Sequence, residues 1–353
     1  MAATITYHEQ TDMENVRKLR EVLKTLPVFA KDYFRAIEPT TSTKTRISYA
    51  YDIRIFFQFL ISQNPLLADA GISGLSISVL DQLKPVDIEE YMEYLKLYDH
   101  PEDQMAVTNG ERGLKRKMSS LRSFYSYYYK RQMIETNPTL LVDMPKIHEK
   151  AIVRLDAGET AALLDYIEHC GDQLTGQRKA YYEKTKLRDL AIVTLLLGTG
   201  IRVSECVGLD VDDVDFRNNG IRLVRKGGSE MVVYFGTEVE KALKSYLEAR
   251  KAIIPVSGHE NALFYSTQRK RIGVQAVENL VKKYAKAITT TKKITPHKLR
   301  STYGTALYQE TGDIYLVADV LGHKDVNTTK KHYAAMDDAR RRKAATAVHL
   351  RED

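Results

Sequence analysis

Apolar side chains recur at helical spacing over most of the first 130 residues, and this periodicity constrains the fold more than any other feature of the chain. The spacing predicts helices over residues 12–36, 44–62, 85–98 and 108–132. Pro39 and the Thr/Ser cluster that follows it separate the first two helices and supply candidate N-cap residues. Because no strand pattern occurs before residue 150, we expect the first part of the chain to be a small helical bundle.

The second part of the chain mixes helix and strand. Helical spacing covers residues 156–170 and 186–197, and β-branched residues at 220–224 and 231–235 flank a glycine turn, which predicts a hairpin. The segment 138–152 has two prolines and no period, as is typical of a linker. We therefore expect a mainly α protein with an N-terminal helical extension (1–39), a helical domain (40–137), the linker (138–152) and an α+β domain (153–353).

Composition sets limits on the function. The chain has 353 residues, 43% of them hydrophobic, which is enough for two domains with cores of their own. The net charge of +7 permits a polyanionic partner without proving one. Neither of the two cysteines has metal-ligand spacing, and the N-terminus has no apolar signal core. The longest apolar run, Leu190 to Leu197, is too short to span a membrane. A cytoplasmic protein without a metal or other cofactor is the expectation.

Residues suited to phosphate chemistry occur in a fixed order in the second part. Arg202 stands in TGIRVSE and Lys226 in RKGG, followed by His297 and Arg300 in HKLR. His323 and Tyr333 stand in LGHKDVNTTKKHYAA. A phenol has a pKa near 10 and needs cations and a base around it to act as a nucleophile at neutral pH. Guanidinium forks can hold non-bridging phosphate oxygens, and a turn lysine can protonate a leaving oxygen. Taken singly, each residue is more often a surface, turn or structural side chain than a catalytic one.

The order of these motifs resembles the tyrosine recombinase family, and the whole chain is similar to its Xer-type and simple integrase members. The resemblance covers residues from about 40 to 345 and rests chiefly on KLRDLAIVTLLLGTGIRVSECVGLDVDDVDF, TPHKLRSTYGT and LGHKDVNTTKKHYA. Ser301 stands where many relatives have a second histidine, and the spacing from His323 to Tyr333 is one residue longer than in many relatives.

The resemblance implies a role for each residue of the set. Tyr333 would attack a DNA phosphodiester, form a 3′-phosphotyrosyl link and release a 5′-hydroxyl. Arg202, Arg300 and His323 would hold the phosphate oxygens. Lys226 would be the general acid for the 5′-oxygen, His297 would assist proton transfer, and Glu205 would support the site. Neither ATP nor a metal is implied, and the sequence has no Walker-type loop and no paired carboxylates of the two-metal kind.

The resemblance also implies a DNA partner for the first part, as a core-binding domain of the SAM-like helical kind. In the segment 111–131 the apolar stripe is expected to face the bundle, and four basic residues to lie largely off it. The start of the helix at 44–62 is a second candidate contact. The candidate DNA-binding residues are Thr43, Lys44, Arg46, Lys115, Arg116, Lys117 and Arg122. A homotetramer on two double-stranded DNA sites, Holliday-junction exchange and a C-terminal helix that packs into a neighbouring subunit are further implications, and an accessory protein stays open.

Several functions stay open at this point. Within the family, chromosome-dimer resolution competes with integration or excision of a mobile element, and the short segment before residue 40 favours the Xer-like layout. Outside it, the chain could be a DNA-binding architectural protein with a vestigial catalytic set. It could also be a type IB topoisomerase that relaxes DNA without exchanging partners.

Overall fold

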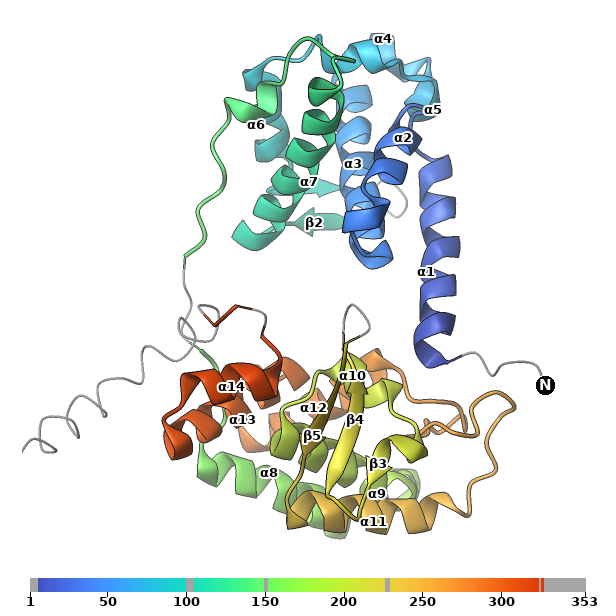
Figure 1. Cartoon of the computed structure of the whole chain (residues 1–353), viewed down its shortest axis with the longest axis vertical. Helices are drawn as coiled ribbons and strands as arrows, with labels where there is room; N and C mark the ends of the chain where they lie inside the picture. Colours follow the sequence, from blue (N-terminus) through green and yellow to red (C-terminus); the bar gives the residue numbers. More distant parts are fainter. Residues whose placement is uncertain (1–5, 100–104, 149–151, 226–228, 324, 327–353) are drawn as a thin grey trace, which may run out of the picture. The chain divides into compact units, whose positions relative to one another are not determined.

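The chain forms two compact units, residues 1–150 and 151–353, which are described separately (Figure 1). The computed structural model describes residues 6–99, 105–148, 152–225, 229–323, 325 and 326. Helices dominate both units, and the strands form only small antiparallel sheets. The predicted fold class, mainly α with an α+β second part, is confirmed.

The first unit is a helical bundle with one short hairpin. Its longer helices are α1 (Tyr7–Lys24), α2 (Ala30–Ala36), α3 (Thr43–Gln63), α6 (Pro85–Tyr94) and α7 (Glu111–Lys130). Shorter pieces are η1 (Glu38–Thr40), α4 (Pro65–Ala68), α5 (Gly71–Gly74), η2 (Ile77–Leu80) and η3 (Pro138–Leu140). The strands β1 (Leu97–Asp99) and β2 (Ala106–Thr108) pair antiparallel.

Two expectations about this unit are wrong. The single helix expected over 12–36 is two helices, because Pro27 lacks the N–H and the space that a continuous helix needs. The expectation of no strand before residue 150 fails at β1 and β2, whose three residues each are too short to show a period of two. The other helices begin and end close to where the apolar spacing placed them.

The core of the first unit is aromatic and is shared by α1, α2, α3, α6 and α7. Ser42 begins α3 by accepting a hydrogen bond from the backbone N–H of Thr45 at 3.3 Å. Phe29, Phe57 and Phe124 meet edge-to-face or tilted, with ring centroids 6.0 to 6.2 Å apart. The Tyr128 hydroxyl donates to the Phe29 carbonyl at 2.8 Å, which joins α7 to the segment before α2. The helices before residue 40 therefore belong to the same core as those after it.

The second unit packs helices around α9 and adds a three-stranded sheet. The helices are α8 (Ala157–His169), η4 (Cys170–Gln173), α9 (Gly176–Thr199), α10 (Val203–Gly208), η5 (Val211–Asp213), α11 (Thr237–Arg250), α12 (Val274–Ile288), α13 (Pro296–Thr311) and α14 (Ile314–Leu321). The strands β3 (Val214–Asp215), β4 (Gly220–Val224) and β5 (Glu230–Tyr234) lie side by side in that order, all antiparallel. The predicted hairpin is confirmed as β4 and β5.

Helix α9 is the centre of this unit. It starts ten residues earlier than its apolar run predicted, and α8, α11 and α13 pack against it (Figure 1). Its buried Asp189 accepts from the neighbouring Arg188 and from the hydroxyl of Tyr284 on α12 at 3.0 Å. Among the described residues, no helix is long and apolar enough to cross a membrane.

Candidate active site

Arg202 is held at the start of α10 by Glu205. It is the N-cap residue of that helix, and its backbone N–H donates to Glu205 Oε2 at 2.7 Å. Its guanidinium Nη1 donates to Glu205 Oε1 at 2.8 Å, so one carboxylate fixes both ends of the residue. Glu205 is buried whereas the Arg202 side chain is 41% exposed. The arrangement leaves Arg202 oriented but within reach of a ligand.

Arg300 approaches the same region from α13. Its side chain is buried, with Nη1 donating to the carbonyl of Gly200 and Nη2 to the carbonyl of Leu321. Gly200 ends α9 in the left-handed conformation at φ 63°, and a Cβ there would come within 2.4 Å of the Tyr303 ring. Glycine at this position therefore lets α13 approach the turn between α9 and α10 closely.

Three arginines converge on the C-terminal turn of α14 (Asp319–Gly322). Arg300 donates to Leu321, and Arg202 Nη2 donates to the carbonyl of Gly322 at 3.2 Å. Arg225, the residue after β4, donates from Nη2 to the carbonyl of Val320 at 2.8 Å. The last carbonyls of a helix lack partners within it and carry partial negative charge, so cations stabilise them. The turn thus collects positive charge directly before His323.

His323 follows this turn. Gly322 adopts a left-handed φ of 60° as the C-cap, and the N–H of His323 donates to the carbonyl of Ala318 at 2.9 Å. Both features are typical of a glycine-ended helix. The backbone of His323 is consequently fixed relative to the carbonyls that receive Arg202 and Arg300.

His297 lies in the first turn of α13, one helical turn before Arg300. Thr295 is the N-cap and Pro296 the first residue of the helix, where its missing N–H costs nothing. The side chain of His297 is exposed, and its carbonyl accepts from the hydroxyl of Ser301 at 3.1 Å. The structure thus places His297 and Arg300 three residues apart on one helix, as their spacing implies.

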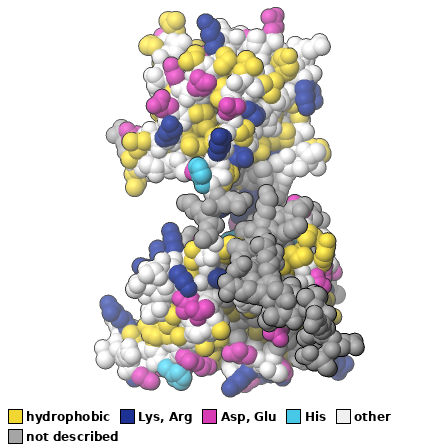
Figure 2. Space-filling view, turned by 90° about the vertical axis from the view of Figure 1, so that its left-hand side faces the viewer, with side chains coloured by type: hydrophobic (Ala, Val, Ile, Leu, Met, Phe, Trp, Pro, Cys, Tyr) yellow, Lys and Arg dark blue, Asp and Glu magenta, His cyan; other side chains and the backbone are white. Residues whose placement is uncertain are grey.

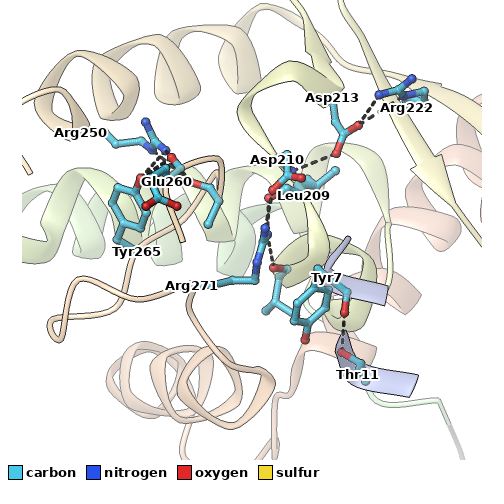
Figure 3. Close-up of polar contacts among 12 residues, drawn as sticks. Tyr7, Thr11, Leu209, Asp210, Asp213, Arg222, Arg250, Glu260, Tyr265 and Arg271 are labelled. Carbon is cyan, nitrogen blue, oxygen red and sulfur yellow. Dashed lines mark hydrogen bonds and ion pairs between the residues drawn. The ribbon is translucent and has the colours of Figure 1, made fainter. Parts of the chain in front are cut away.

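The far end of α10 is fixed by Arg271 (Figure 3). Its Nη1 donates to the carbonyls of Val207 at 3.2 Å and Leu209 at 2.7 Å, and its Nη2 pairs with Asp210. These contacts satisfy backbone carbonyls at the C-terminal end of α10. At its N-terminal end, the carboxylate of Glu205 accepts from the backbone N–H of the N-cap residue Arg202. Side chains therefore hold both ends of α10.

Two members of the predicted set, Lys226 and Tyr333, lie outside the described residues. The structure brings Arg202, Glu205 and Arg300 together at the turn that leads to His323, and it places His297 on the Arg300 helix. Sequence reasoning missed Arg225, which reaches the same turn. The only signal for Arg225 was its position directly before Lys226.

Buried groups around α10 are held in their neutral or paired forms. Cys206 is fully buried, and burial, together with the nearby Glu205 charge, raises the pKa of its thiol to about 12. Burial lowers the pKa of Arg225, while Glu205 opposes that shift and Arg202 adds to it. Within the described ranges, no group of three or more His, Cys, Asp or Glu side chains is placed to hold a metal ion.

Comparison with known proteins places this chain among DNA recombinases. The family model that matches the chain is that of the phage integrase family, over residues 154–340. The chain is 32% identical to a tyrosine recombinase XerC of Caldanaerobacter subterraneus subsp. tengcongensis over 346 residues, covering 94% of this chain and 90% of the relative. It is 29% identical to a tyrosine recombinase XerS of Streptococcus equi subsp. equi, covering 91% and 95%.

The chain belongs to the phage integrase family. It is a site-specific DNA recombinase of the tyrosine, Xer-like type. Nothing in these matches supports the alternatives of a silent architectural protein or a topoisomerase.

Solved structures share the recombinase fold. A XerH site-specific recombinase bound to a palindromic difH substrate, in a post-cleavage complex, superposes with a TM-score of 0.63 at 18% identity, covering 98% of this chain and 91% of that one. The Tn1549 transposon integrase in complex with transposon right end DNA gives a TM-score of 0.61 at 23% identity, covering 90% and 99%.

Four of the candidate DNA-binding residues of this recombinase bind other parts of the first unit. Arg46 is buried and pairs with Glu38 at 3.1 Å, and Lys117 is buried against Asp52 at 3.2 Å. Arg116 also pairs with Asp52, and Arg122 donates to the carbonyls of Thr139 and Val142. The expectation that the basic residues of α7 lie largely off its buried face is wrong for Lys117. A buried carboxylate on α3 draws this lysine into the core, a contact that α7 periodicity cannot reveal.

Four candidates keep accessible side chains in the recombinase. Lys44 is exposed in the first turn of α3, Arg116 keeps 46% of its side chain exposed beside Asp52, and Thr43 and Lys115 are half-buried. In Figure 2, the Lys and Arg side chains on the visible face of the first unit are interspersed with acidic and apolar ones. On that face the basic side chains do not form one broad surface.

Proposed function

We propose that this recombinase cleaves DNA by attack of Tyr333 on a phosphodiester, which forms a 3′-phosphotyrosyl link and releases a 5′-hydroxyl. The observation that carries the proposal is the convergence of Arg202 and Arg300 on the α14 C-terminal turn directly before His323. Since the covalent link retains the energy of the phosphodiester, a second 5′-hydroxyl can reverse the step, and neither ATP nor a metal is needed.

Arg202 and Arg300 would hold the non-bridging oxygens of the scissile phosphate. A phosphorane transition state carries more negative charge than the diester, so donors already oriented in the protein stabilise it selectively. Glu205 supplies that orientation for Arg202, and the carbonyls of Gly200 and Leu321 supply it for Arg300. Removal of one such donor typically costs about 3–4 kcal/mol of transition-state stabilisation.

Proton transfer is assigned to the remaining members of the set. Lys226 would protonate the leaving 5′-oxygen, His323 would donate to a phosphate oxygen, and His297 would assist proton transfer near the nucleophile. The support is the β4–β5 hairpin whose strands flank Lys226 in the sequence, the fixed backbone of His323 and the exposed position of His297. An imidazole can donate or accept protons near neutral pH, which suits such steps.

Double-stranded DNA is the proposed partner, gripped by a core-binding domain (40–137) and a catalytic domain (153–353) joined by the linker 138–152. The support is twofold: the net charge of +7 and the DNA bound in the XerH and Tn1549 integrase structures. Lys44, Lys115, Arg116 and Thr43 are the accessible candidates for contacts in the first domain. Each phosphate contact by a lysine should add to the salt dependence of binding.

The proposed assembly is a homotetramer on two DNA sites that exchanges strands through a Holliday junction in the cytoplasm. The proposed exchange helix after residue 338 lies outside the described residues, and an accessory protein remains possible in this scheme. Resolution of chromosome dimers and movement of a mobile element are both compatible with it. The similarity to XerC and XerS over nine-tenths of the chain favours the first role.

A nicked suicide substrate tests the chemistry. The short released strand diffuses away, so the covalent protein–DNA complex accumulates and is counted on a denaturing gel. The wild-type protein should form this complex, whereas Tyr333→Phe should bind the same DNA and form none. Covalent complex formed by Tyr333→Phe at the wild-type level would show that another residue is the nucleophile.

A further inference from the structure

Arg225 pairs with Ser229 at the turn end of the β4–β5 hairpin, directly before Lys226. Its backbone N–H donates to the carbonyl of Ser229 at 2.8 Å, immediately beyond the pairing of Val224 with Glu230 in β4 and β5. The backbone of Arg225 is therefore part of the sheet, and its position sets where the following residues leave that sheet.

The side chain of Arg225 is held at the α14 C-terminal turn. Nη2 donates to the carbonyl of Val320 at 2.8 Å and Nη1 to that of Asp319 at 3.5 Å. A Cβ on Gly322 would overlap Arg225 Nη1, so the absence of a side chain at Gly322 is what lets the guanidinium lie there. Two carbonyls in a row match the planar fork of an arginine and not the single ammonium of a lysine.

This contact joins two parts of the proposed site that are far apart in sequence. One is the hairpin end that precedes Lys226, and the other is the turn that precedes His323. Arg225 is also close enough to Glu205 and Arg202 for their charges to act on it.

We infer that Arg225 is a positioning residue, which fixes the hairpin end on the α14 C-terminal turn so that Lys226 meets the leaving 5′-oxygen. The inference rests on the proposed function, in which Lys226 is the general acid. In the cleavage step the Tyr333 hydroxyl passes its proton to His297 and its oxygen forms a bond to phosphorus. The bond from phosphorus to the 5′-oxygen breaks, and that oxygen takes a proton from Lys226. Without the Arg225 contact the end of β4 is no longer fixed on the α14 C-terminal turn, and proton transfer from Lys226 should slow.

A sulfur leaving group separates loss of the proton donor from loss of phosphate binding. In a substrate with sulfur in place of the bridging 5′-oxygen, the leaving thiolate needs no proton because a thiol is far more acidic than an alcohol. Arg225→Ala should cleave the oxygen substrate about 100-fold more slowly than wild type, the loss that a displacement of about 1 Å can cause. It should cleave the sulfur substrate within a few-fold of wild type. An equal loss on both substrates, or no loss on either, would overturn the inference.

Arg222→Ala is the matched control, because Arg222 lies three residues earlier on β4 and pairs with Asp213 with 57% of its side chain exposed (Figure 3). It should cleave both substrates at wild-type rates. Arg225→Lys, which keeps the charge but not the fork, should fall between wild type and Arg225→Ala on the oxygen substrate and serves if the alanine variant unfolds. Thermal unfolding of each variant shows whether it is folded at the assay temperature.

Lys226→Ala distinguishes failure of this inference from failure of the proposed function. If sulfur restores cleavage to Lys226→Ala but not to Arg225→Ala, Lys226 is the acid and Arg225 does not position it. If sulfur fails to restore Lys226→Ala, the assignment of the general acid is wrong. If wild type forms no covalent complex with either substrate, the proposed function itself is wrong.

Discussion

The buried ion pair between Asp52 on α3 and Lys117 on α7 allows a quantitative test of whether Lys117 stabilises the fold or contacts DNA. Only 1% of the Asp52 side chain and 6% of the Lys117 side chain are exposed. Arg116, which is more exposed, pairs with the other oxygen of the Asp52 carboxylate. Burial lowers the pKa of Lys117, while Asp52 opposes that shift by favouring the charged ammonium. Replacing Asp52 with asparagine removes that compensation and leaves the ammonium buried alone.

The expected destabilisation is large. Removing one partner of a buried ion pair typically costs about 3–5 kcal/mol, because the other charge stays desolvated. In a unit of this size, 1 kcal/mol shifts the unfolding midpoint by about 2–4 °C, so Asp52→Asn should lower it by roughly 6–20 °C. The double variant Asp52→Asn with Lys117→Met should recover most of the loss, since neither charge is then buried.

Thermal unfolding followed by circular dichroism measures the stability, and binding to a recombination site at several salt concentrations measures the phosphate contacts. Lys117→Met should lower the stability and leave the salt dependence of DNA binding as in wild type. Lys115→Met, on the same helix with a half-buried side chain, is the control. It should keep the stability and reduce the slope of log K against log salt by about one. A slope reduced in Lys117→Met without loss of stability would refute the structural role.

Three further predictions concern the candidate site. Gly200→Ala should lower the free energy of unfolding by at least about 1–2 kcal/mol because of the left-handed φ alone. It should also reduce cleavage, because the new Cβ would meet the ring of Tyr303. Wild-type stability and cleavage would contradict this packing. Glu205→Gln should slow single-turnover cleavage about 10- to 100-fold, since a charge-assisted hydrogen bond to Arg202 contributes about 1.5–3 kcal/mol. An unchanged rate would show that Arg202 needs no carboxylate. The thiol of Cys206 has a folded pKa of about 12 against an ordinary 9.0, so its stabilising contribution is complete below pH 9 and disappears as the pH rises towards 12. Denaturant titrations from pH 8 to 11 should show this decline relative to Cys206→Ala, and identical pH dependence in the two proteins would disprove it.

Local rules account for most of the helices and for the hairpin. The apolar spacing placed α3 and α7 within a few residues, and β-branched residues around a glycine turn predicted β4 and β5. Prediction failed at β1 and β2, which are too short for a period, and at the first helix, where Pro27 was overlooked. At the site, the sequence named Arg202, Glu205, His297, Arg300 and His323, but it gave Arg225 no role.

The sequence by itself determined the helical character, the division into helical and mixed parts, and the set of residue types that phosphate transfer requires. These depend on side-chain periodicity and on the chemistry of individual groups, which are properties of short segments. Tertiary structure alone decided where those groups meet. Arg300 donates to the carbonyl of Gly200, 100 residues earlier, and Arg202 donates to that of Gly322, 120 residues later. Lys117 on α7 is buried because it pairs with Asp52 on α3. Such contacts join distant segments, so the arrangement at the α14 C-terminal turn exists only once the second unit has folded around α9.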